Sequence, residues 1–422
     1  MKLDFHKLPA AWKPLLILVP LFLTYIILLP HSGHGGDTYC WVEWAKYIFL
    51  NGLSNVYKSW TDYLPLFHYA LKVFGYIQGS PESIERNIYT LKILVLLFDF
   101  VAGFFLIRLV NEKFKDVQRS VLYSMFFFFN IAYFYNTIIW GQVDGIVACF
   151  LMISFYYAYK QSVLLSLVFV LLALNMKLQA IVFIPIIGLM LLPLVVSRFS
   201  VKNLLIWLLI PLAIQSLILL PFALAGDLSG VWNVVIGSLG KYPVVSMNAY
   251  NMWELLLTGS MMEIKDATLF LGISYKSWGL LAFLCLSFIA LLPLLVQVYK
   301  SIIKGQPFNP SLEKLLIAAS LVFLLFFYVN TQMHERYSHP ALIFLAAYAI
   351  ISGRIWPYLL ASIAYFQNME DVLHYLQLHK YGTFIFNNEF IASLYLLAIM
   401  LLFLDLYEIR FPLIKQLKVN EN

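Results

Sequence analysis

The sequence predicts an all-α, polytopic integral membrane protein with about 11 to 13 transmembrane helices. Hydrophobic residues make up 62% of the chain and charged residues only 12%, with a mean hydropathy of +0.82. A water-soluble domain has about a quarter of its residues charged. Apolar runs of about 17 to 25 residues recur along the chain, which is the length that crosses a hydrocarbon core of about 30 Å. These observations exclude an ordinary soluble domain.

The first apolar run follows Lys2, Lys7 and Lys13, an arrangement that also begins a signal peptide. No small-residue cleavage site follows the run, so we expect it to remain as the first span. Later apolar runs are bounded by polar, glycine or proline residues, which end a helix. The spans that we expect are 14–30, 88–110, 120–138, 144–160, 162–176, 178–197, 203–225, 277–299, 313–331, 338–352, 355–370 and 390–409.

Basic residues gather in alternate short loops, which predicts the orientation of the spans. Positive charge before the first span places the amino terminus in the cytoplasm, and the count of spans places the carboxyl terminus there too. The large loops 31–87 and 226–276 are then external parts of one membrane domain, 1–422. The loops assigned to the cytoplasm contain Arg108, Lys113, Lys115, Arg119, Arg198, Lys202, Lys300, Lys304, Arg410, Lys415 and Lys418.

The first external loop contains two stretches that are too short and too amphipathic to cross a membrane. In the first, Trp41, Trp44, Ala45 and Ile48 recur at helical spacing with polar residues between them. A helix of this kind is expected to lie on the membrane surface. The second stretch begins at Asp62. The second external loop mixes polar and aromatic residues, as a carbohydrate-binding or headgroup-binding surface does.

Asp37 follows two glycines and opens the first of these surface helices. An aspartate in that place accepts backbone N–H bonds as an N-cap, which is a structural role. A carboxylate held at a helix N-terminus also stays ionised near neutral pH, so it can accept a proton from a sugar hydroxyl. Both roles are open at this point. Asp62, followed by Tyr63, is a second candidate for substrate binding, and its alternative is a solvated loop aspartate.

A polar motif, Trp140-Gly141-Gln142-Val143-Asp144, lies in a very short turn between two predicted spans. Trp140 offers an apolar face and one N–H group, Gln142 offers two donors and an acceptor, and Asp144 accepts hydroxyl groups. Proteins recognise sugars with this set of groups. The structural alternative is an interfacial tryptophan next to an aspartate that caps the following helix.

A second polar motif places His334, Glu335 and Arg336 consecutively at the end of another span. Arginine is suited to bidentate phosphate contacts, histidine to a further hydrogen bond, and the glutamate to orienting either of them. The alternative is a Glu335–Arg336 ion pair at a span end. Lys177 and Gln179 are predicted on the same side, where Lys177 must be paired or extend its ammonium group to the interface.

Other ionisable residues carry weaker signals. Asp99 falls inside a predicted span, and we expect a structural hydrogen bond there. The three cysteines are isolated and the histidines are dispersed, so the sequence predicts neither a disulfide framework nor a metal site, although a divalent metal remains open as a cofactor. No basic stretch is interleaved with aromatics, so no nucleic-acid partner is expected.

Taken together, these motifs resemble the GT-C superfamily, the multi-pass glycosyltransferases that use polyprenyl-phosphate-linked sugars. The chain looks most similar to bacterial relatives of the second mannosyltransferase of GPI-anchor synthesis. Leu178 stands where the family pattern usually has proline. The matching features, in chain order, are Gly36-Asp37, Asp62-Tyr63-Leu64-Pro65-Leu66, Asp99 after Leu91-Lys92, Trp140-Gly141-Gln142-Val143-Asp144, Asn175-Met176-Lys177-Leu178-Gln179 and His334-Glu335-Arg336-Tyr337.

The resemblance implies an enzyme that transfers a hexose, with mannose favoured, from a polyprenyl-phosphate sugar with inversion at the anomeric carbon. The acceptor would be a glycan, a glycolipid or a protein, on the non-cytoplasmic side of a cell membrane, such as the bacterial inner membrane. Asp37 is then expected to be the general base, and His334, Arg336 and Lys177 are expected to bind the donor phosphate. The substrate-binding residues expected are Asp62, Tyr63, Trp140, Gln142, Asp144, Gln179 and Glu335.

The main alternative is a transporter or flippase of lipid-linked sugars. A transporter places its polar groups near the middle of the bilayer, often at broken helices. Here Asp99 is the main group of that kind, and the other candidates cluster at one boundary. A polymerase or ligase of lipid-linked glycans would need large basic external loops, which this chain lacks. A purely structural membrane protein is the remaining alternative.

Overall fold

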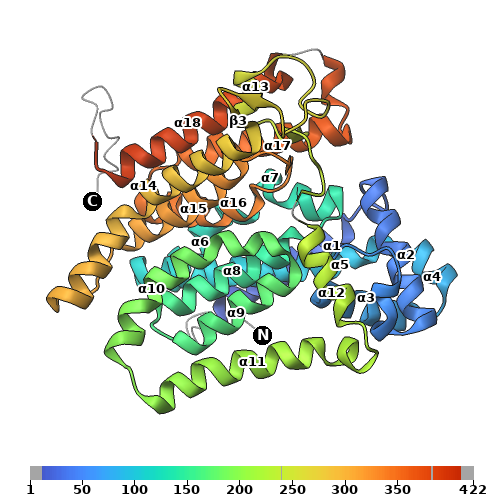
Figure 1. Cartoon of the computed structure of the whole chain (residues 1–422), viewed down its shortest axis with the longest axis horizontal. Helices are drawn as coiled ribbons and strands as arrows, with labels where there is room; N and C mark the ends of the chain where they lie inside the picture. The colour runs from blue at the N-terminus through green and yellow to red at the C-terminus, as the bar shows by residue number, and fades with distance from the viewer. Residues whose placement is uncertain (1–11, 239, 382–383, 410–422) are drawn as a thin grey trace, which may run out of the picture.

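The structure of the chain is a computed structural model, which describes residues 12–238, 240–381 and 384–409. These residues are mostly helical (Figure 1). Lys2, Lys7, Arg410, Lys415 and Lys418, which were used to predict the orientation, lie outside them. The α-helices of the first half are α1 (Lys13–Ile27), α2 (Gly35–Asn51), α3 (Pro65–Gln78), α4 (Pro81–Arg86), α5 (Leu91–Phe114), α6 (Val117–Phe128), α7 (Ile131–Phe134), α8 (Asp144–Tyr159), α9 (Val163–Met176), α10 (Ile184–Ser197) and α11 (Val201–Leu224).

The second half continues with further helices and four very short strands. Its α-helices are α12 (Leu228–Gly237), α13 (Met252–Leu256), α14 (Tyr275–Lys304), α15 (Leu312–Val329), α16 (His339–Ser352), α17 (Trp356–Leu373) and α18 (Asn388–Leu406). The strands are β1 (Ser246–Met247), β2 (Leu269–Phe270), β3 (Ile273–Ser274) and β4 (Met333–His334). Single turns of other helix types are η1 (Leu53–Lys58), η2 (Ile88–Thr90), η3 (Tyr135–Trp140), η4 (Leu178–Phe183), η5 (Leu378–Tyr381) and η6 (Phe384–Phe386).

Helices occupy the ranges in which spans were predicted, usually within a few residues. Among the described residues, 6 helices are long and apolar enough to cross a membrane, or 7 if one bent pair is a single span. Several shorter apolar helices, such as α8, α9 and α16, lie beside them. An all-α, multi-pass membrane protein agrees with these features, whereas the count of 11 to 13 crossings stays a prediction.

The span predicted at 120–138 is wrong as a continuous helix. It consists of α6 followed by a second segment, Ile131–Trp140, and the two are bent by 59°. Asn130 stands at the break, where its side chain accepts a hydrogen bond from the backbone N–H of Tyr133 and so caps the second segment. Apolar periodicity did not reveal the break, because both segments are apolar on either side of Asn130.

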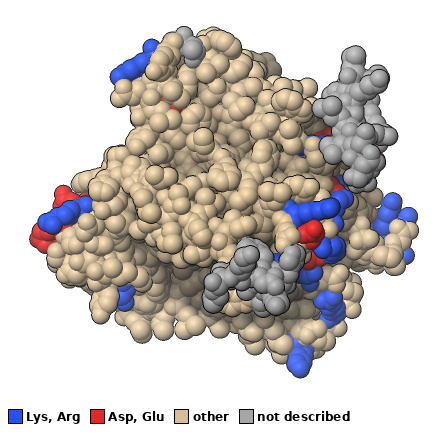
Figure 2. Space-filling view, turned by 180° about the vertical axis from the view of Figure 1, so that it is seen from behind, with Lys and Arg blue, Asp and Glu red and all other residues tan. Residues whose placement is uncertain are grey.

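Helix α15 lies at the centre of the bundle, and α11 lies at its edge. The share of buried residues is 83% for α15 but only 6% for α11. Figure 1 shows α11 along one side of the molecule, while α2, α3, α4 and α12 gather at one end. Figure 2 shows a broad face almost free of Lys, Arg, Asp and Glu, with the charged residues gathered at its margins. A face of this composition is suited to contact with lipid.

The amphipathic helix predicted at residues 41–48 forms as part of α2, but its apolar face does not lie against lipid. Trp41, Trp44, Ala45 and Ile48 are at most 3% exposed. They pack against α3, whose apolar residues, including Phe67, cover them. The prediction that this face lies on the membrane surface is therefore wrong, because the neighbouring helix α3 covers the apolar face of α2.

The second external loop is tied to the α15–α16 connection. Strand β1 pairs in parallel with β4, with Ser246 opposite Met333 and Met247 opposite His334. The backbone N–H of Gln332 also donates to the carbonyl groups of Val244 and Val245. This pairing holds the polar motif that begins at His334 in a fixed extended segment rather than in a free turn.

Close packing of α5 on α6 gives a testable prediction of stability. A Cβ atom added at Gly103 would lie 2.2 Å from Cζ of the buried Phe128 ring. We expect Gly103→Ala to lower the free energy of unfolding by about 1–3 kcal/mol, because overpacking displaces a well-packed ring. Gly188→Ala is the matched control, since that helical glycine has open space around it. Thermal unfolding of the two variants in the same detergent checks the difference; equal stability would contradict the packing described.

Candidate functional site

Asp37 lies in the first turn of α2. His34 is the N-cap of this helix, and its Nδ1 accepts from the backbone N–H of Asp37 at 3.3 Å. The interpretation of Asp37 as the N-cap is therefore wrong: the N-cap is His34, three residues earlier, and the helix begins at Gly35. Because Asp37 does not cap the helix, its carboxylate is available to other elements. One oxygen, Oδ2, lies 3.0 Å from His34 Nδ1.

The Trp140 turn supplies the first of these elements. The residues before it, Tyr135–Trp140, form a π-helix, and Gly141 continues with a φ of +86°, which favours glycine. Trp140 Nε1 donates to Asp37 Oδ2 at 2.7 Å, and the Trp140 carbonyl accepts from the backbone N–H of His34 at 2.8 Å. Trp140 is only 1% exposed. It is thus a buried partner of Asp37 and not an interfacial aromatic residue.

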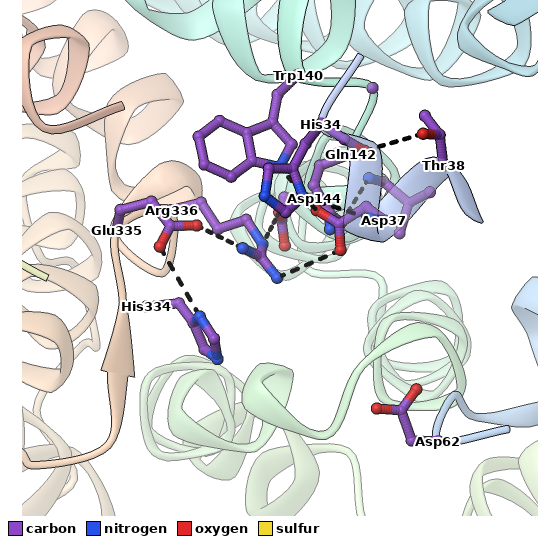
Figure 3. Close-up of polar contacts among 12 residues, drawn as sticks. His34, Asp37, Thr38, Asp62, Trp140, Gln142, Asp144, His334, Glu335 and Arg336 are labelled. Carbon is purple, nitrogen blue, oxygen red and sulfur yellow. Dashed lines mark hydrogen bonds and ion pairs between the residues drawn. The ribbon is translucent and has the colours of Figure 1, made fainter. Parts of the chain in front are cut away.

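Arg336 reaches the same carboxylate from the α15–α16 connection. Its Nη2 lies 4.0 Å from Asp37 Oδ1, and its Nε lies 3.8 Å from Asp144 Oδ2 (Figure 3). Nη1 donates to Oε1 of the neighbouring Glu335. The predicted Glu335–Arg336 pair therefore exists, but it belongs to a larger group of charges. One guanidinium group contacts three carboxylates that come from three different segments.

Lys177 is the second cation of the site. Its Nζ lies 2.6 Å from Asp144 Oδ1 and 3.4 Å from Gln142 Oε1, and the residue is only 8% exposed. The alternative in which this lysine extends to the interface is wrong, because Asp144 pairs with it inside the protein. Asp144 is the first residue of α8 and does not cap it; Val143 occupies the N-cap position.

A small cavity lies beside Asp144 and Lys177, with polar side chains on one side and apolar side chains on the other. The side chains of Gln179 and Tyr337 line it together with Asp144 and Lys177, while Phe323 and Phe326 form its apolar side. Its volume of about 20 Å³ is close to the space for a single water molecule. A sugar does not fit without movement of the lining side chains. The Tyr63 hydroxyl lies 3.4 Å from Gln142 Oε1, and its ring lies 5.5 Å from Lys177 Nζ, so Tyr63 joins the site.

Larger hollows lie elsewhere, between the broken α6–α7 segment and α17. They have volumes of about 500 and 720 Å³ and are lined mainly by apolar side chains. No Asp, Glu, Lys, Arg or His lines either of them. The smaller cavity beside Lys177 is therefore the better candidate for chemistry, although it holds less space.

Two of the predicted residues lie at the margin of the site. Asp62 makes no contact with the Asp37 group; it forms an ion pair with Lys241, and both side chains are about two-fifths exposed. His334 Nδ1 lies 3.8 Å from Glu335 Oε2, and its ring packs edge-on against Tyr242. Figure 3 shows Asp62 on a separate segment, away from Asp37 and Arg336. The other predicted residues are brought together: Asp37, Tyr63, Trp140, Gln142, Asp144, Lys177, Gln179, Glu335 and Arg336.

The electrostatics favour an ionised Asp37. Burial raises the pKa of this carboxyl, but the Arg336 guanidinium and contacts with His34 and Trp140 lower it more, so the net pKa lies well below its usual range. Burial likewise raises the pKa of Glu335, and Arg336 and His334 bring it down to about 2. Burial lowers the pKa of His334, which favours its neutral form at pH 7. The site therefore combines ionised carboxylates with two cations and a neutral imidazole.

Three buried polar atoms at the centre of the site make no hydrogen bond to other described residues. These atoms are Gln142 Nε2, Asp144 Oδ2 and Arg336 Nε, of which the last two face each other as an ion pair at 3.8 Å. Leaving a buried polar group unsatisfied costs about 1–3 kcal/mol, so such groups usually have a function. Two donors and an acceptor grouped beside an ionised carboxylate are suited to a polar, hydroxyl-bearing ligand.

Lys92 contributes to the site in a way that sequence reasoning missed. This buried side chain donates to three backbone carbonyl groups, those of Pro30 at 3.2 Å, Ile138 at 2.8 Å and Ser32. Pro30 and Ser32 lead into α2, and Ile138 lies in the π-helix before Trp140. One ammonium group thus joins the two segments that bring Asp37 and Trp140 together. Its position within an apolar helix was the signal available in the sequence.

Lys92 therefore acts as a positioning residue in our prediction. We expect Lys92→Met to lower the turnover of whatever reaction Asp37 supports by about tenfold or more, because small misplacements of reacting groups are costly. The expected change is in kcat rather than in KM. Lys46→Met, at an exposed pair with Glu85, is the control. A kcat equal to that of the unmodified protein would contradict this role, and thermal unfolding tells whether the fold was kept.

Asp99 is fully buried on α5, as expected for a carboxyl inside a span. Tyr133 and Thr137 lie beside it, but neither carboxylate oxygen makes a hydrogen bond of normal geometry with the described residues. The expected structural hydrogen bond is therefore not formed. Helix α8 also approaches Asp99 closely, since a Cβ atom on Gly145 would lie 2.1 Å from Asp99 Oδ1.

The residues described by the structure contain no group of three His, Cys, Asp or Glu side chains arranged to hold a metal ion. In the site itself, the Arg336 guanidinium occupies the space between the three carboxylates. Comparisons of the whole chain with family models and with curated proteins find no match.

Proposed function

We propose that the chain is an inverting glycosyltransferase that moves a hexose, mannose in the first instance, from a polyprenyl phosphate to an acceptor hydroxyl. The acceptor class comprises glycans, glycolipids and proteins, and the site faces the non-cytoplasmic side of the membrane. One observation carries the proposal: an ionised Asp37 lies between the Trp140 N–H and the Arg336 guanidinium. A general base therefore adjoins a cation of the kind that binds phosphate.

The base is the first part of the mechanism. The acceptor oxygen attacks the anomeric carbon, the bond from that carbon to the phosphate oxygen breaks, and the electron pair stays on the phosphate. Asp37 takes the proton of the acceptor hydroxyl and later releases it to water. Proton transfer of this type contributes about 10²- to 10⁴-fold in rate. The Trp140 N–H fixes the direction of the carboxylate that performs it.

The departing phosphate is the second part. Arg336 and Lys177 are the two cations of the site, and they come from segments about 160 residues apart in the sequence. In the absence of substrate they are held by Asp144, Glu335 and Asp37. A phosphate competes with these carboxylates for the guanidinium. Its binding weakens the hold of Arg336 on Asp37, which makes Asp37 a stronger base once the donor is in place.

The lipid part of the donor fits the same location. The small cavity beside Lys177 has Asp144 and Gln179 on one side and Phe323 with Phe326 on the other. A polyprenyl phosphate likewise has a charged part and an apolar part, because its phosphate head is joined to a hydrocarbon chain. Since the cavity is far smaller than a hexose, binding must displace its lining side chains, and Gln142 Nε2, which makes no hydrogen bond to the described residues, can contact the ligand.

A direct assay tests the proposal. Purified protein is incubated with a panel of radiolabelled polyprenyl-phosphate hexoses and with glycan, glycolipid and peptide acceptors. We expect label in the acceptor together with release of free polyprenyl phosphate. No bond cleavage with any donor would overturn the proposal. Movement of intact donor between leaflets of proteoliposomes would instead indicate the alternative, a transporter or flippase of lipid-linked sugars.

A further inference from the structure

An exposed pair of aromatic rings lies next to the site and has no part in the mechanism above. Tyr39 is 61% exposed and Trp60 is 56% exposed. Their ring planes are nearly parallel, at 17°, with centroids 6.2 Å apart. Trp60 also rests on the buried Trp44, at 5.3 Å, which fixes its orientation. We call this exposed, nearly parallel pair the aromatic platform, because its apolar ring surfaces are open to a ligand.

The platform is joined to polar groups that bind hydroxyls. Asp62 follows Trp60 by two residues and is paired with Lys241 of the second external loop. Both side chains remain about two-fifths exposed, so they can still hydrogen-bond a ligand. Lys241 Nζ lies 5.3 Å from the centre of the Tyr242 ring, and that ring contacts His334. Contacts therefore connect the Asp62–Lys241 pair, two residues after Trp60, to the motif that contains Arg336.

Cys40 shows that the platform and the general base border the same space. This half-buried residue lies one turn from Asp37 on α2 and directly follows Tyr39. Burial and the nearby carboxylates of Asp37 and Asp62 raise the pKa of its thiol to about 11, while Lys241 lowers it. Both carboxylates are thus close enough to Cys40 to act on it. Arg336 lies 4.0 Å from the Asp37 carboxylate, so Cys40 and Arg336 both lie near the general base.

We infer that Tyr39, Trp60, Asp62 and Lys241 form an acceptor subsite that binds a pyranose ring of a glycan. The C–H face of the sugar packs on the aromatic platform, and the Asp62–Lys241 pair binds its hydroxyl groups. A sugar held there directs the next hydroxyl of the acceptor towards Asp37. This inference rests on the proposed function, and it selects a carbohydrate from the acceptor classes left open there.

The alternative use of exposed aromatic residues is to anchor a protein at the membrane surface. The charged pair Asp62–Lys241 favours a sugar-binding role over a membrane anchor. An anchoring ring lies among apolar neighbours, whereas Trp60 is followed two residues later by Asp62, a partly exposed carboxylate paired with Lys241. The same external segment also offers an ordinary exposed aromatic residue for comparison, because Tyr76 on α3 is 85% exposed and makes no ring contact with the platform among the described residues.

Kinetics of Trp60→Ala test the subsite. We expect the KM for a mannose-terminated oligosaccharide acceptor to rise about tenfold, with the donor KM and kcat unchanged. Trp60→Phe should restore much of the affinity, and Tyr76→Ala should leave all three constants unchanged. An unchanged acceptor KM in Trp60→Ala overturns the inference while transfer itself continues. A loss of activity that occurs only in phosphatidylethanolamine–phosphatidylglycerol vesicles and not in detergent would assign the pair to the membrane, which also overturns it.

A binding experiment separates this inference from the proposed function. Saturation-transfer NMR with methyl α-D-mannopyranoside, on the purified protein, detects sugar C–H protons that lie against the protein. We expect a clear signal with the unmodified protein and with Tyr76→Ala, and about a tenfold weaker signal with Trp60→Ala. The signal requires no turnover, so its presence supports the subsite even if no donor is found. Equal signals in the three proteins would overturn the subsite.

Discussion

Replacing Asp37 by asparagine is expected to abolish hexose transfer, with a fall in kcat of about 10²- to 10⁴-fold. Asparagine has the same shape, and its carbonyl oxygen can still accept from Trp140 Nε1, but it cannot take a proton from the acceptor. Arg336 and Lys177 remain, so donor binding should stay close to that of the unmodified protein. Single-turnover kinetics with labelled donor check the loss of transfer, and a donor-binding titration checks that donor binding is unchanged.

Asp116→Asn is the matched control for this variant. Asp116 is the N-cap of α6 and is exposed, and asparagine caps a helix as well as aspartate does. Turnover by Asp37→Asn at the rate of the control would exclude Asp37 as the base. Loss of donor binding together with turnover would mean that Asp37 mainly holds Arg336 in place.

The pH dependence gives an independent view of the same carboxyl group. Because Arg336 holds the pKa of Asp37 below its usual range, the carboxylate stays ionised as the pH falls, and the base form is retained. We therefore expect kcat/KM to be nearly constant from about pH 7 down to about pH 5. An acid limb near pH 6 would show that another group, with a higher pKa, performs the proton transfer.

The helices were largely predictable, because each depends on a local run of apolar residues. The break at Asn130 and the burial of the α2 face were not. Both are decided by neighbours distant in sequence: Asn130 bonds Tyr358 and Ser362 of α17, and Trp41 donates to the carbonyl group of Gly141. A single sequence contains no signal for such pairings. The same limit explains the N-cap error at Asp37, since moving the N-cap three residues back to His34 changes no apolar pattern.

The site was predictable in its ionisable residues but not in how they are held. Asp37 and Trp140 are 103 residues apart, yet each lies in a short polar motif at a span end, which is a visible signal. The π-helix that ends at Trp140 and the three carbonyl contacts of Lys92 depend on backbone geometry. The separation of Asp62 from the main cluster likewise depends on Lys241, a loop residue that carries no motif.

Replacing Arg336 is expected to have the second large effect, on the donor rather than on the acceptor. Arg336→Lys retains a positive charge but loses the planar, bidentate contact that suits a phosphate. We expect kcat/KM for the donor to fall about 10²- to 10³-fold, with little change in the acceptor KM. Arg354→Lys, at an ion pair with Asp405 outside the site, is the control. A donor titration unchanged by Arg336→Lys would remove Arg336 from the phosphate site.

Arg336→Met separates the two roles of this guanidinium, which binds phosphate in our proposal and neutralises carboxylates in the structure. Leaving Glu335 buried without its partner is expected to cost about 3–5 kcal/mol of folding free energy. Adding Glu335→Gln to Arg336→Met removes that unpaired charge, so the double variant should recover most of the lost stability. It should not recover donor binding, since no guanidinium is present. Recovery of both in thermal unfolding and donor titration would mean that Arg336 acts only by stabilising the fold.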